Sequence, residues 1–142
     1  MKLPAIGVAF AADDEPAWLD TRVPGVRWFP IHVPSREPDA KTAEGDAAAG
    51  DGVQDATVLI RMEPGHGYPP HRHVGAEEVV VLAGGYRDEE GEHRQGDYVR
   101  YPAGSVHAPV ALGDSDTPAG PENPPCVLFA VAHDGIERVL AS

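Results

Sequence analysis

Residues 65–84 read GHGYPPHRHVGAEEVVVLAG, and the fold prediction starts from this stretch. His71 and His73 are separated by one residue, which on an extended strand places both imidazoles on the same face. The segment 74–76 permits a turn, so Glu77 can open the next strand and reach back with its carboxylate. Two neutral imidazoles that converge on one point suit a transition metal. The stretch therefore predicts two strands that share a metal site.

A second segment, residues 96–107, reads GDYVRYPAGSVH and supplies another histidine. The turn at residues 102–104 could bring this histidine from a distant strand to the first two. Three imidazoles and one carboxylate would leave one or two positions of an octahedral metal open, whereas they would saturate a tetrahedral zinc. An open position distinguishes a working site from a purely structural one. The predicted metal ligands are His71, His73, Glu77 and His107.

The rest of the chain is typical of an all-β protein. Gly and Pro number 16 and 15 among 142 residues, and both disfavour helix interiors. Short apolar runs recur between turn signals, which favours a sandwich or barrel of many short strands. The expected strands are 26–33 with an edge or bulge at Pro30, 57–63, 77–82, a hairpin of 86–88 with 92–94, 97–101, 107–112, and a closing hairpin of 127–132 with 136–140.

Length and charge limit the remaining possibilities. A chain of 142 residues predicts one domain, with a core over about residues 20–140. Residues 34–55 lack an apolar period, so we expect a mobile loop there. The apolar stretch 3–12 is too short for a membrane span and reads as a non-cleaved first segment. The formal net charge of −12 opposes binding to nucleic acid and anionic membranes, although acidity alone names no partner. We expect a cytoplasmic protein with a small-molecule ligand or substrate.

Cysteine usage restricts the metal chemistry. The single cysteine, Cys126, excludes an internal disulfide and every Cys-rich zinc motif. It lies in the apolar run Cys-Val-Leu-Phe-Ala-Val, where a buried core thiol is expected. A metal site in this chain must therefore use histidine and carboxylate.

The two histidine segments resemble the cupin superfamily. The first cupin motif, Gly-x5-His-x-His-x3–4-Glu-x6-Gly, is matched by Gly65, His71, His73, Glu77 and Gly84. The second motif, Gly-x5-Pro-x-Gly-x2-His-x3-Asn, is matched by Gly96, Pro102, Gly104 and His107, with Ala111 in place of the final Asn. The resemblance implies an antiparallel jelly-roll β-barrel around one divalent transition metal ion (iron, zinc, manganese or nickel). It also implies a homodimer, which many such cupins form.

The resemblance extends to two groups of cupins. Residues 71–91 and 96–109 are similar to the cupin domain of the ChrR anti-sigma factors and to acetylacetone-cleaving dioxygenases. One cysteine cannot supply the separate His and Cys zinc site of the anti-sigma factors, so sigma-factor inhibition is not expected. The dioxygenases often use three histidines alone, whereas Glu77 makes this site similar to zinc-binding cupin domains.

Two functions follow from this resemblance. One is a metal-dependent oxidoreductase of the dioxygenase type that acts on a small carbonyl or enol compound, with Glu77 also serving as catalytic base. The other is a non-catalytic zinc-binding module for sensing or ligand binding.

Residues beside the motifs are candidates for a substrate pocket. Tyr68, Tyr98 and Tyr101 flank the ligands, and Arg61 lies on a strand with an apolar face. We predict that these four residues line the pocket, with ordinary packing or solvent exposure as the alternative. The acidic stretch 88–90 is predicted to be a solvated turn.

Overall fold

The computed structural model describes residues 16–32, 55–134 and 136–138, and every regular element in these ranges is a β-strand. No helix among them is long and apolar enough to cross a membrane. The loop predicted at 34–55 lies almost wholly outside the described residues. The strands are β1 (Leu19–Asp20), β2 (Val26–His32), β3 (Ala56–Met62), β4 (His71–His73), β5 (Glu77–Ala83), β6 (Gly85–Asp88), β7 (Gly91–Arg94), β8 (Tyr98–Tyr101), β9 (Val106–His107), β10 (Val110–Ala111), β11 (Cys126–Ala132) and β12 (Ile136–Arg138).

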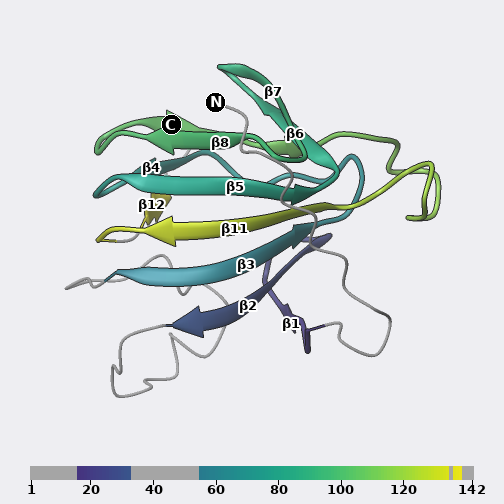
Figure 1. Ribbon diagram of the computed structural model, residues 1–142, viewed down its shortest axis with the longest axis horizontal. Helices are drawn as coiled ribbons and strands as arrows, with labels where there is room; N and C mark the ends of the chain where they lie inside the picture. The colour runs from purple at the N-terminus through teal and green to yellow at the C-terminus, as the bar shows by residue number, and fades with distance from the viewer. Residues whose placement is uncertain (1–15, 33–54, 135, 139–142) are drawn as a thin grey trace.

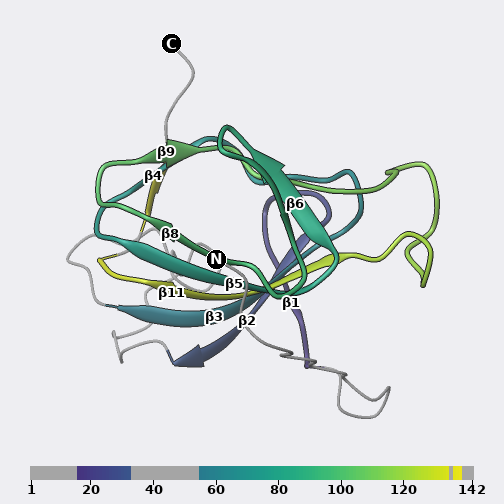
Figure 2. The same cartoon turned by 45° about the horizontal axis from the view of Figure 1, so that its top comes forward.

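The strands form three antiparallel sheets (Figure 1). The largest has the order β1-β2-β3-β11-β5-β8. Two smaller sheets, β10-β6-β7 and β12-β4-β9, face it across the interior (Figure 2). The prediction of an all-β antiparallel protein is therefore confirmed, although the strands are divided among three sheets and do not make one closed barrel.

Alternation along the strands of the large sheet separates its two faces. In β3, Val58 and Met62 point into the main core, whereas Leu59 packs on the outer face with Leu82 and Val127. This period of two is the pattern that the sequence predicted for the strand. The inward side chains of the large sheet form one wall of the interior.

Two local predictions are also confirmed. The pairing of β2 with β3 shifts register between Pro30 and His32, so the proline marks a bulge. Cys126 is completely buried, and burial raises the pKa of its thiol to about 12. The thiol is therefore a core group and stays protonated at neutral pH.

Two strand predictions near the C-terminal half are wrong. The segment 107–112 is interrupted, because Pro109 has no N–H to donate to a ladder, and its halves join different sheets as β9 and β10. The expected closing hairpin is absent from the described pairings. Instead, β12 crosses to the opposite sheet, where Ile136 lies opposite His73. As a result, β9 and β12 flank β4 in the small sheet that carries His71 and His73.

The turn after β5 requires a residue without a side chain. Gly84 has φ of +62°, and a Cβ at this position would lie 2.4 Å from the carbonyl oxygen of Pro125. Only glycine avoids both the left-handed strain and the clash. This turn sends the chain from the large sheet into β6, which passes behind the histidines.

Candidate metal centre

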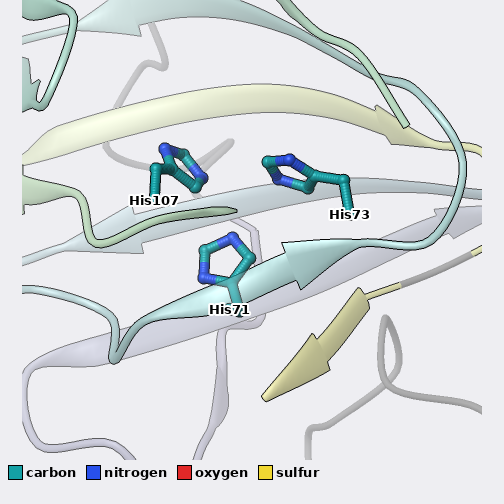
Figure 3. A group of neighbouring side chains, drawn as sticks. All are labelled: His71, His73 and His107. Carbon is teal, nitrogen blue, oxygen red and sulfur yellow. The ribbon is translucent and has the colours of Figure 1, made fainter. Parts of the chain in front are cut away.

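Two short strands bring three histidines together. His71 and His73 lie on the inward face of β4, and the antiparallel pairing of β4 with β9 puts His107 directly opposite His71. The side chains are turned toward one another (Figure 3), and one nitrogen of each lies within 4.8 Å of the others. All three residues are buried. The three histidines can therefore bind a metal ion.

Hydrogen bonds to the outer ring nitrogens hold two of the imidazoles. His71 Nδ1 lies 3.0 Å from the carbonyl oxygen of Pro69, and His107 Nδ1 lies 3.0 Å from Oδ2 of Asp88. Both partners are acceptors, so each Nδ1 carries the proton and each Nε2 keeps a free lone pair. Metal-binding histidines are typically oriented in this way by an oxygen on the far side of the ring.

His73 provides the test of whether the site fits a metal. The Ser105 hydroxyl donates to the Pro102 carbonyl and therefore accepts from His73 Nδ1, at 3.0 Å. On the other side of the ring, His73 Nε2 is buried and has no hydrogen-bond partner. It lies 3.0 Å from Oε2 of Glu77. A buried nitrogen without a partner is energetically unfavourable. A metal cation bound by both His73 Nε2 and Glu77 Oε2 would remove this cost.

Burial keeps the histidines in their metal-binding form. Desolvation lowers the pKa of His71 to about 4, against the opposing effect of its hydrogen bond to the Pro69 backbone. Burial also lowers the pKa of His107, although the hydrogen bond to Asp88 opposes the shift. Both imidazoles are therefore neutral at pH 7, and a neutral imidazole is the form that binds metal.

Asp88 is a site residue that the sequence analysis missed. Its side chain is completely buried, not part of a solvated turn as predicted. Oδ2 accepts from His107 and from the Tyr101 hydroxyl at 2.6 Å, while Oδ1 accepts from His93 and from the backbone N–H of Glu90, both at 3.0 Å. Burial raises the pKa of this carboxyl, but the hydrogen bonds outweigh burial and the net pKa is lowered. Asp88 thus remains a carboxylate behind His107.

Alternation in β6 could have suggested this position. Tyr86 and Asp88 are two residues apart on one strand, so they share a face, and Tyr86 is fully buried. The Tyr86 hydroxyl is hydrogen-bonded to that of Tyr101. The run of acids at 88–90 concealed this pattern, because its composition is that of an exposed turn.

The two adjacent glutamates have different surroundings. Glu77 is buried and lines an interior cavity together with His71 and His107. Glu78 points to the other side of the sheet, where its carboxylate accepts a hydrogen bond from the Tyr98 hydroxyl at 2.6 Å. Glu77, and not Glu78, is therefore the glutamate whose carboxylate lies beside the three histidines.

The cavity beside the histidines has a volume of about 90 Å³. Its wall is mostly apolar. Its polar or aromatic lining residues are Thr21, Trp28, Tyr68, His71, Glu77, Tyr86 and His107.

The four pocket residues predicted from the sequence lie in different places. Among the described residues, Tyr68 lines the cavity, whereas Tyr98, Tyr101 and Arg61 are outside its lining. Tyr101 lies against the histidines, with its ring centroid 4.2 Å from that of His107. Arg61 is paired with Glu63 at 2.8 Å. Trp28 and Tyr86 are lining residues that the sequence analysis did not name.

Comparison with known families agrees with this geometry. A family model described as the ChrR Cupin-like domain matches residues 8–117, which is most of the chain. The chain belongs to this family. The cupin fold expected from the motifs is thereby confirmed for this ChrR-like cupin, and similar solved structures share it. A comparison with curated proteins gives no significant match.

Three similar structures illustrate the range of cupins with this fold. The anti-sigma ChrR complex with SigE from Rhodobacter sphaeroides is 24% identical, with a TM-score of 0.56 over 83% of this chain and 49% of the matched chain. This ChrR-like cupin thus spans about half of that relative. A proposed acetylacetone dioxygenase from Methylibium petroleiphilum is 14% identical, with a TM-score of 0.62 over 99% and 86% of the two chains. The polyketide cyclase RemF from Streptomyces resistomycificus is 18% identical, with a TM-score of 0.55 over 87% and 77%.

Proposed function

We propose that this ChrR-like cupin is a metal-dependent oxidoreductase of the dioxygenase type, acting on a small carbonyl or enol compound. The observation that carries the proposal is the shared wall between the metal centre and the apolar cavity. His71, His107 and Glu77 all line that cavity. A molecule held there would lie directly against the site, as catalysis requires and as a purely structural metal site does not.

The proposed metal ligands are His71, His73 and His107, with Glu77 as a fourth. When bound, a divalent metal would supply a Lewis acid that polarises a carbonyl oxygen, and iron would add redox chemistry. The histidines would provide three imidazole donors, and two of them, His71 and His107, line the cavity where a substrate would be held. The bound ion is proposed to be iron, zinc, manganese or nickel.

Glu77 is the proposed catalytic base. Its carboxylate lies at the cavity wall, 3.0 Å from His73 Nε2, and a carboxylate ligand can exchange. A proton on the carbon between two carbonyl groups is acidic enough for a carboxylate to accept it, which leaves the substrate as its enolate and the proton on Glu77. The cavity beside Glu77 has a mostly apolar lining, which would limit competing reactions of that form with water.

The direct test is oxygen uptake by the iron-loaded protein. Metal-free protein would be loaded with Fe²⁺ without oxygen, then mixed with oxygen and a small diketone such as acetylacetone, or with a hydroxy-ketone. We expect one O₂ consumed for each substrate molecule lost. Loading with manganese, nickel and zinc would follow in parallel, and no turnover with any metal would overturn the proposal for these substrates.

A matched pair of variants distinguishes the loss of the Glu77 carboxylate at the site from the mere loss of one negative charge. Glu77→Gln should lower the turnover rate roughly 100-fold or more, because the amide cannot accept the proton. Glu78→Gln carries the same change on the opposite face of the sheet and should leave the rate unchanged. Equal rates in both variants would remove Glu77 from the mechanism.

The alternative is a zinc-binding module that senses or binds a ligand without chemistry. The short approach of Glu77 to His73 favours it, because three imidazoles and this carboxylate would saturate a tetrahedral zinc. It predicts tightly bound zinc with four protein ligands and no exchangeable water. Zinc-edge X-ray absorption, with and without the diketone, separates the two functions. The homodimer and the cytoplasmic location stay predictions from the sequence.

A further inference from the structure

Two buried side-chain atoms in the described part of the chain have no hydrogen-bond partner. One is His73 Nε2, which the metal centre accounts for, and the other is Nε1 of Trp28. An indole N–H can only donate, so its unmet requirement is for an acceptor. A buried donor without an acceptor is energetically unfavourable, and in a native protein such a group calls for an explanation.

Trp28 belongs to the wall of the same cavity as the metal centre. It lies on β2, next to Ile60 of β3 and, beyond that, Leu128 of β11, and all three side chains line the cavity. Glu77 stands opposite Ala132, which is four residues from Leu128 along β11. Four residues of a strand span roughly 13 Å, so Trp28 and Glu77 lie at different levels of the cavity.

Two hydroxyls that line the cavity, those of Thr21 and Tyr86, are already engaged in hydrogen bonds. The Thr21 hydroxyl donates to the backbone carbonyl of Val26 at 2.7 Å. Tyr101 donates to Asp88, so the hydroxyl bond between Tyr86 and Tyr101 uses the proton of Tyr86. Among the described lining residues, Trp28 Nε1 is the buried donor left without an acceptor, and its cross-strand neighbours Ile60 and Leu128 are aliphatic.

We propose that Trp28 Nε1–H is a second binding position in the cavity, which donates a hydrogen bond to an oxygen of a small neutral ligand. The ligand would have an apolar body and a carbonyl or ether oxygen at the end away from the histidines. A negatively charged group is disfavoured there, because the lining residues include no Lys or Arg to pair with it. The identification of this ligand as the substrate rests on the function proposed above. The binding position at Trp28 does not depend on that function.

The test uses a pair of ligands that differ only in the oxygen. Full-length protein with ¹⁵N-labelled indoles would be titrated with cyclohexanone and with methylenecyclohexane, which has the same shape. The protein would be used as purified and again after metal removal. We expect cyclohexanone to shift the Trp28 indole N–H resonance downfield and methylenecyclohexane to leave it nearly unchanged.

Two variants complete the test. Trp28→Phe should weaken cyclohexanone binding roughly 3- to 10-fold, the value of one neutral hydrogen bond, and leave methylenecyclohexane binding unchanged. Trp18→Phe is the control, because Trp18 packs on the outer face of the large sheet. Equal shifts with both ligands, no shift with the ketone, or a ketone preference that survives Trp28→Phe would overturn the proposal. Failure of oxygen uptake alone would not affect this result, so the two proposals fail separately.

Discussion

The two ends of the cavity are built by opposite means. At the metal end, β4 and β9 place three imidazoles, and each Nδ1 is hydrogen-bonded to an oxygen, which for His107 belongs to Asp88 of β6. At the other end, β2, β3 and β11 supply aliphatic side chains around Trp28. The difference implies that hydrogen bonds orient the imidazoles at the metal end. At the Trp28 end, the burial of apolar side chains stabilises the fold. Changes at each end should therefore affect different quantities.

The largest expected effect is on folding, at the apolar end. Leu128→Ala removes a buried side chain from the cavity wall and should lower the free energy of unfolding by about 2–5 kcal/mol. Metal affinity of the folded variant should equal that of the wild type, because Leu128 is absent from the histidine cluster. Urea denaturation and metal titration of the same preparation check both statements. A clear loss of metal affinity would show that the two ends are coupled.

Lowering the pH should decrease the free energy of unfolding through His71, at the metal end of the cavity. The pKa of His71 is about 4 in the folded chain and about 6.5 when exposed, so between these pH values the unfolded chain binds more protons. The free energy of unfolding of metal-free protein should thus fall as pH is lowered from 6.5 to 4, by about 3 kcal/mol from this residue. Urea denaturation across this range measures the slope. The slope should persist in Leu128→Ala and become shallower in His71→Gln, and a flat wild-type profile would contradict the burial argument.

Asp88→Asn tests whether the carboxylate behind His107 supports metal binding. The amide keeps the size of the side chain but cannot accept hydrogen bonds from His107, Tyr101 and His93 together. Metal affinity should fall about 10- to 100-fold, as is usual when the oxygen behind a histidine ligand is lost. Competition with a chelator measures the change. Glu90→Gln is the control, since its side chain is exposed, and equal affinities in both variants would remove Asp88 from the site.

Ser105→Ala should have the smallest effect. It removes the acceptor of His73 Nδ1, a neutral hydrogen bond worth about 0.5–1.5 kcal/mol. Metal affinity should therefore fall by less than about tenfold, and Ser105→Thr, which keeps a hydroxyl, should restore it. The same chelator competition applies. A loss larger than that of Asp88→Asn would reverse the proposed ranking of the two partners.

Local patterns in the sequence were sufficient for the strands and for the three histidines. The i, i+2 spacing of His71 and His73 determines one face of a strand, whatever lies around it, and alternation marked β3 correctly. The partner of β12 could not be predicted in this way, because strand pairing depends on the whole fold. A hairpin with β11 was the local expectation, yet β12 extends the histidine sheet.

The residues that complete the site depend on tertiary contacts. Asp88 comes from an acidic run that resembles an exposed turn, and only the fold of β6 beneath the histidines buries it. Trp28 lies more than forty residues before His71 in the sequence, and the packing of the small sheet that holds β4 against the large sheet that holds β2 brings both to one cavity. Neither position is part of a spacing motif, and only the alternation of Asp88 with the buried Tyr86 along β6 could have indicated one of them.

The central claim is that the three histidines hold one functional metal ion. The most direct measurement is elemental analysis of the purified protein, together with X-ray absorption at the edge of the metal found. We predict one metal ion per chain with three imidazole ligands, and loss of the metal from a folded His73→Ala variant. An unchanged metal content in His73→Ala, or a purified wild type that binds no divalent metal, would contradict the account.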